Sequence, residues 1–198
     1  RIVDPWGFPA LKKANFVPLS AIPFEKVLKS KDYSQWVHFY TADCNFNRFW
    51  NDPYRYIDIL KKFSGVITPD FSIYRDYLWH DQLYNMAKNR TLAYLLQKEG
   101  INTIVNVRWG DETTYCFAFN GLERGGTYAV STHGVTKKVV ERKYFQKGLA
   151  EMVEHLQPET IICHGAAPYI IFGPYIEKGI KVVRIPSYTE TIHARRAA

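Results

Sequence analysis

Cysteine is scarce in this chain. The 198 residues include three cysteines, Cys44, Cys116 and Cys163, which lie far apart in the sequence. Because no Cys-x-x-Cys pair occurs, the sequence offers neither the usual ligand spacing of a structural zinc site nor a disulfide framework. Scattered free thiols are typical of a reducing compartment, so we expect a cytoplasmic protein.

Long apolar runs are also missing. No stretch approaches the roughly 20 apolar residues that a membrane-spanning helix needs, and no segment has the pattern of a secretory signal peptide. The sequence contains no internal repeat, low-complexity tract or interdomain linker. We therefore expect a single domain over residues 1–198, with one buried core and no contact with a membrane.

Nucleotide-binding motifs are absent as well. Neither GxxxxGK[ST] nor GxGxxG occurs, and GxSxG and HExxH are missing too. These absences argue against a P-loop NTPase and against a standard dinucleotide-dependent dehydrogenase. We expect a protein that works without a cofactor.

Two properties of the composition are informative. The net charge is +7, with an isoelectric point near 9.2, and aromatic residues make up 16% of the chain. Lysines and arginines bind polyanions because they release counterions from phosphates, and aromatic rings provide surfaces on which bases stack. The composition therefore favours a DNA partner, although aromatic residues also fill cores and charge also aids solubility.

The order of apolar runs predicts an α/β fold. Six runs have the character of strands, at residues 36–40, 65–68, 101–108, 127–131, 160–163 and 181–185. Helical periodicity predicts helices between them, at residues 53–63, 74–99, 140–156 and 169–178, with a short irregular or helical piece at 112–122. Residues 1–35 contain four prolines and are expected to wrap irregularly around the domain.

Strands that alternate with helices form right-handed units with parallel strands. An eight-stranded barrel typically needs about 250 residues, which is more than this chain has. We therefore expect an open, mostly parallel sheet of about six strands in a three-layer α/β/α sandwich. In such a fold the site lies at the carboxyl edge of the strands.

Polar residues follow several of the predicted strands. Asp70 comes directly after Pro69, where the apolar run of residues 65–68 ends. An alternative is that Asp70 caps the next helix and Phe71 fills the core. Other polar or aromatic residues also follow predicted strands, and we expect them to gather with Asp70: Asp43, Arg108, Trp109, Asp111, His133 and His164.

These residue types suit cleavage of an N-glycosidic bond. A carboxylate can stabilise the oxocarbenium-like transition state, and Asp70 is our first candidate, with His133 as a helper and Asp43 and Asp111 as further catalytic candidates. A base flipped out of DNA needs stacking surfaces and hydrogen-bond partners. Candidates for substrate binding are Phe71, Tyr74, Asn106, Arg108, Trp109 and His164, and for DNA phosphates Arg195 and Arg196.

Two other functions remain open. Asp43, Asp70 and Asp111 could hold Mg²⁺ for a nuclease, because hard cations prefer carboxylates. The basic charge alone also fits a non-enzymatic DNA-binding accessory protein of a mobile element. His133 and His164 lack the spacing of metal ligands, so our leading hypothesis includes no metal.

Four segments resemble a known family. PDFSIYRD (69–76), NVRWGDE (106–112), STHG (131–134) and KYFQKGL (143–149) are similar to a prokaryotic and phage family called domain of unknown function 4417. The resemblance spans about residues 36–186. It implies a role in phage–host conflict or in mobile DNA, without implying a mechanism.

A weaker resemblance concerns the uracil-DNA glycosylase superfamily, which shares the open parallel plan. Pro69-Asp70-Phe71 and residues 185–188 are similar in outline to its two motifs. Ile185 replaces the histidine of the second motif, and the Asp-Pro order is reversed, so His133, His164 or His193 would have to substitute. The chain is also similar to antiviral bacterial DNA glycosylases, and this second likeness implies that it excises a modified base from phage DNA.

Overall fold

The computed structural model describes residues 1–187 and 190–191. Its main sheet has seven strands, and every pair of neighbours is parallel. This confirms the predicted α/β class and the open, parallel sheet. The strands are β3 (Ala21–Pro23), β4 (Trp36–His38), β5 (Gly65–Ile67), β6 (Thr103–Asn106), β7 (Thr127–Ser131), β8 (Thr160–His164) and β9 (Lys181–Ile185).

The sheet is strongly curled. The rings of His38 on β4 and His164 on β8 lie 4.8 Å apart, although four strand spacings separate these strands. In a flat sheet that separation would be about 19 Å, because neighbouring strands lie about 4.8 Å apart. The strands also follow chain order without a reversal, so right-handed crossovers all fall on the same face.

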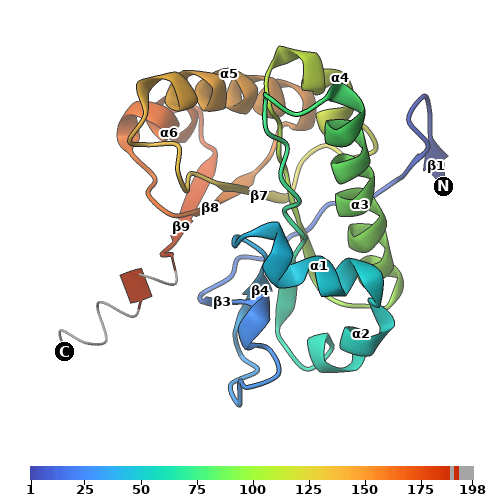
Figure 1. Ribbon diagram of the computed structural model, residues 1–198. Coiled ribbons are helices and arrows are strands. Elements are labelled where there is room, and N and C mark those ends of the chain that lie inside the picture. The colour runs from blue at the N-terminus through green and yellow to red at the C-terminus, as the bar shows by residue number, and fades with distance from the viewer. Residues whose placement is uncertain (188–189, 192–198) are drawn as a thin grey trace.

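Helices cover that one face (Figure 1). They are α1 (Asp43–Asn51), α2 (Tyr54–Leu60), α3 (Trp79–Lys98), α4 (Tyr115–Ala118), α5 (Val139–Leu156) and α6 (Tyr169–Ile176). Val105, Tyr128 and Ile161 of the sheet share a core cluster with residues of α3, α5 and α6. Val37 and Val66 share another with residues of α1, α2 and α3. Among the residues described, no helix is long and apolar enough to cross a membrane.

The opposite, concave face carries the alternate residues of the strands. Ile67, Ile104, Ala129 and Ile162 form a small core cluster there with Ala14 of the N-terminal segment. Nearer the carboxyl ends, the same face becomes polar, since Asn106, Ser131 and His164 end three of these strands. The helices therefore gather on one face of the sheet, whereas the sequence predicted a layer of helices on each.

Three elements differ from the prediction. The N-terminal residues are not wholly irregular: they contain β3, the 3₁₀ turn η1 (Phe24–Lys26) and a small hairpin of β1 (Ile2–Val3) and β2 (Phe8–Pro9). Helix α1 was not predicted, because its mostly polar sequence has only a narrow apolar side, buried through Phe46 and Phe49. Helix α3 begins at Trp79, which leaves residues 68–78 as an extended loop at the carboxyl edge of the sheet.

Candidate functional site

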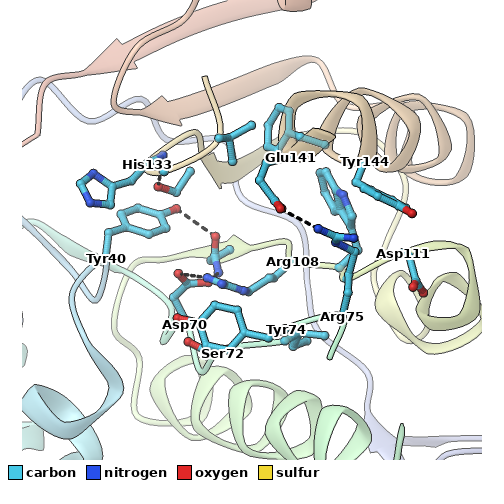
Figure 2. A pocket seen from close by; sticks show the side chains of 18 of the residues that line it. Tyr40, Asp70, Ser72, Tyr74, Arg75, Arg108, Asp111, His133, Glu141 and Tyr144 are labelled. Carbon is cyan, nitrogen blue, oxygen red and sulfur yellow. Dashed lines mark hydrogen bonds and ion pairs between the residues drawn. The ribbon is translucent and has the colours of Figure 1, made fainter. Parts of the chain in front are cut away.

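A cavity of about 890 Å³ opens at the carboxyl ends of the strands. Figure 2 shows the side chains that line it. All but one of the segments that form its walls come at or directly after the end of a parallel strand, as expected for a site at this edge of the sheet. The walls come from residues 40–42 after β4, 70 and 72–76 after β5, 106–111 at the end of β6, 131 and 133–135 at the end of β7, and Lys138, Glu141, Tyr144 and Phe145 around the start of α5.

Asp70 lines this site beside Arg108, with 7% of its surface exposed (Figure 2). Arg108 donates from Nη1 to its Oδ2 over 2.5 Å, and Asn106 donates from Nδ2 to its Oδ1 over 2.7 Å. The hydroxyl of Thr68 in turn accepts the backbone N–H of Asn106 at 2.8 Å. Both carboxylate oxygens are thus held by side chains from the neighbouring strand end, and the fixed geometry suits an electrostatic role.

The Asp70–Arg108 ion pair is charged at neutral pH. Burial raises the pKa of Asp70, against the opposing effects of the Arg108 charge and the hydrogen bonds from Arg108 and Asn106. Burial lowers the pKa of Arg108, but the Asp70 charge outweighs this and the net direction is upward. The raised pKa of Asp70 favours a neutral carboxylic acid, whereas the raised pKa of Arg108 favours the ion pair. The 2.5 Å contact with Arg108 and the second donor, Asn106, both stabilise the charged carboxylate, so the ion pair prevails.

Tyr40 connects Asp70 to the concave interior of the sheet. Its hydroxyl donates to Oδ1 of Asn106 over 3.0 Å, and its ring stacks on His164 with the centroids 4.4 Å apart. Burial raises the pKa of Tyr40 well above its usual value, so the group stays a phenol and a donor. Asn106 is therefore oriented by Tyr40 on one side and Asp70 on the other.

The two predicted histidines have different environments. His133 is exposed and lines the cavity, whereas His164 is 3% exposed and lies behind Tyr40. His164 Nδ1 is 3.2 Å from the Ser131 hydroxyl, and its Nε2 has no partner among the described residues. Burial lowers the pKa of His164 to about 4, so its imidazole is neutral at neutral pH.

Two arginines at the cavity are packed against tyrosine rings. The guanidinium of Arg75 lies 4.0 Å from the ring centre of Tyr144 and bonds Glu141 at 2.6 Å. The guanidinium of Arg108 lies 5.8 Å from the ring centre of Tyr74. The first contact joins the loop of residues 68–78 to α5, and the second places Tyr74 beside the Asp70–Arg108 pair.

Phe71 and Asp43 do not line the cavity. Phe71 is 1% exposed, packs against Phe46 and has its backbone held by Asn89, so its ring belongs to the core and offers no face to a base. Asp43 accepts hydrogen bonds from the backbone and hydroxyl of Ser72 at 3.0 and 2.9 Å. It therefore holds the loop after β5 in place. Asp70 caps no helix, because the N-cap of α3 is Leu78.

Trp109 and Asp111 line the cavity, and both side chains also make contacts that support the fold. The Trp109 ring packs on Phe145 and Gly148 of α5. Asp111 accepts from the backbone and the hydroxyl of Thr113 at 3.0 and 2.7 Å, which caps the 3₁₀ turn η2 (Glu112–Thr114). Of the four residues proposed as catalytic, Asp70, Asp111 and His133 share the cavity and Asp43 lies outside it.

The three candidate carboxylates do not form a metal cage. Within residues 1–187 and 190–191, no group of three His, Cys, Asp or Glu side chains is placed to hold a metal ion. Asp43, Asp70 and Asp111 are engaged instead with Ser72, Arg108 and Thr113. The proposed DNA contacts Arg195 and Arg196, and the substitute His193, lie outside the described residues.

Sequence reasoning missed several residues of the site. Tyr40, Arg75, Glu141 and Tyr144 all line the cavity. Tyr40 ends the apolar run of residues 36–40, where its position after a strand is the same signal that pointed to Asp70. Glu141 and Tyr144 come from the start of α5, and no pattern in the sequence shows that this helix turns toward the cavity.

Comparison with known proteins gives a family and two phage relatives. Residues 1–184 match the family described as Domain of unknown function (DUF4417). The Gene 1 protein of Mycobacterium phage L5 is 30% identical over 164 residues, which cover 81% of this chain and 71% of that protein. The Gene 1 protein of Mycobacterium phage D29 is 26% identical over 168 residues, covering 83% of this chain and 62% of that protein. No solved structure matches.

Proposed function

This chain belongs to the family Domain of unknown function (DUF4417), as its motifs indicated, and we propose that it is a DNA glycosylase. Its substrate would be a modified base in phage DNA, released as a defence against the phage. The observation that carries the proposal is the buried carboxylate of Asp70, fixed by two donors beside a large cavity whose walls carry aromatic rings and charges of both signs. The two phage relatives are consistent with a role in phage biology.

The chemistry follows from the charge on Asp70. When the N-glycosidic bond breaks, its electron pair leaves with the base and positive charge develops on the sugar. Water then adds to the sugar, and its proton is transferred to the departing base. A carboxylate in a low-dielectric site stabilises that positive charge strongly, and Asp70 is already held in place by Arg108 and Asn106.

The cavity suits a nucleotide with a bulky base. Its volume of about 890 Å³ lies in the range that proteins use for small-molecule ligands. Two of the tyrosines that line it, Tyr74 and Tyr144, each lie beside a guanidinium, and such surfaces bind both bases and phosphates. His133 is exposed and supplies a further polar contact in the cavity.

Release of the base is the direct test. The purified protein is incubated with phage DNA that carries modified bases and with unmodified DNA of the same length, and the supernatant is examined by mass spectrometry. We expect a free modified base and matching abasic sites in the first sample, with activity retained in EDTA. Strand cleavage that EDTA abolishes would instead indicate a nuclease, and DNA binding without either product would indicate an accessory protein.

A further inference from the structure

The start of α5 carries an unusual concentration of positive charge. Residues 137–147 include five cations, Lys137, Lys138, Arg142, Lys143 and Lys147, and one carboxylate, Glu141. Glu141 is already bonded to Arg75 at 2.6 Å. In the part of the chain that the structure describes, no carboxylate lies within ion-pair distance of these five cations. We call these five residues the α5 basic surface.

This placement of charge works against the helix. The amino end of a helix carries partial positive charge, which disfavours nearby cations such as Lys138 and Arg142. Lys143 and Lys147 are one turn apart, so like charges face each other along the helix. Both effects are relieved if an anion binds, so a polyanion bound there would stabilise the helix as well as the complex.

The surface reaches the cavity at one end. Lys138 lines the cavity together with Glu141 and Tyr144, whereas Lys143 and Lys147 are exposed further along α5. Val139 and Val140 are each 57% exposed in the same first turn. Apolar side chains exposed among cations indicate a face that a partner covers, and DNA offers both phosphates and base edges to such a face.

We propose that the α5 basic surface binds the phosphodiester backbone of DNA and brings the target nucleotide to the cavity. The inference rests on the proposed function for the nature of the polyanion. The sequence suggested no role in DNA binding for this part of the chain. The cations that the sequence analysis named were Arg108, Arg195 and Arg196. Each lysine or arginine that neutralises a phosphate releases a counterion, which makes the affinity depend on salt.

The test compares two double variants that remove equal charge. Lys143→Gln/Lys147→Gln alters the α5 basic surface. Lys178→Gln/Lys181→Gln alters two exposed lysines next to the amino end of β9, whereas the cavity lies at the carboxyl ends of the strands. Binding to a DNA duplex of fixed length is measured over a range of salt concentrations. We expect the first variant to bind about tenfold or more weakly at low salt and to lower the slope of log K against log salt by roughly two. The second should match the wild type.

Wild-type behaviour of the first variant would overturn the proposal, and so would equal weakening of both variants, which would reflect net charge alone. Poly-glutamate that binds the wild type as tightly as DNA would also overturn it, because the partner would then be an acidic protein. Base release is followed in the same samples. If the first variant binds DNA more weakly and no base is released by the wild type, the α5 basic surface is supported and the glycosylase proposal is wrong. If base is released and the first variant binds like the wild type, the glycosylase proposal is supported and the α5 basic surface is wrong.

Discussion

Gly148 shows how one residue shapes a wall of the cavity. A Cβ atom at this position would lie 2.0 Å from Nε1 of Trp109, which packs directly on the backbone of α5. Gly148→Ala should therefore lower stability by up to about 2 kcal/mol, because overpacking costs about 1–3 kcal/mol and alanine regains roughly 1 kcal/mol of helix propensity. Thermal unfolding measures the change. In a Trp109→Leu background the same substitution should no longer destabilise, and an equal loss in both backgrounds would contradict this packing.

His164 makes stability depend on pH. Its pKa is lowered from 6.5 to about 4 by burial, so below pH 6.5 the unfolded chain binds a proton that the folded protein does not. Stability should be complete above about pH 6.5 and fall by up to about 3 kcal/mol as the pH drops to 4, at about 1.4 kcal/mol per pKa unit. The pKa of His38 is also lowered by burial, so it adds in the same direction.

Urea unfolding at several pH values measures this dependence. His164→Gln should flatten the loss of stability between pH 6.5 and 4, and His80→Gln, at an exposed position on α3, should leave the curve unchanged. An identical pH dependence in the His164 variant and the wild type would show that another group is responsible.

At the scale of elements, Arg75 joins two walls of the cavity, the loop of residues 68–78 and α5. Arg75→Ala removes both the ion pair to Glu141 and the stacking on Tyr144. The loss of stability should stay below about 1 kcal/mol, since both charged side chains are partly exposed. Amide hydrogen exchange of residues 70–76 should nevertheless become faster. Arg55→Ala on α2 provides the control, and equal exchange in the two variants would show that the contact does not hold the loop.

For the molecule as a whole, the sequence predicts the order of strands better than their arrangement in space. The apolar run of residues 160–163, for example, forms a strand that is buried on both faces. The curl of the sheet depends on packing between distant strands, such as the contact of Tyr40 with His164, which no local pattern contains. The three-residue strand β3 is too short to show a period and ends in a proline, so the sequence does not predict it.

The centre of the site was predictable and its rim was not. Asp70, Asn106 and Arg108 follow neighbouring strands, so their meeting at one edge follows from parallel topology alone. Phe71 was misplaced because a sequence cannot show which of two adjacent residues in an irregular loop turns into the core. Tyr144 was missed because its side of α5 faces the cavity only after the helix has packed on the sheet.

The rate of base release by Asp70→Asn tests the central claim most directly. Asparagine keeps the shape of Asp70 and removes its charge, and Asp58→Asn, at an exposed position on α2, is the matched control. DNA binding and thermal unfolding in the same samples establish that the variants are folded. We expect base release to fall by about 10²-fold or more in Asp70→Asn, the loss typical of one strong electrostatic contact, and to stay unchanged in the control. A folded Asp70→Asn protein that releases base at the wild-type rate would contradict the role of Asp70.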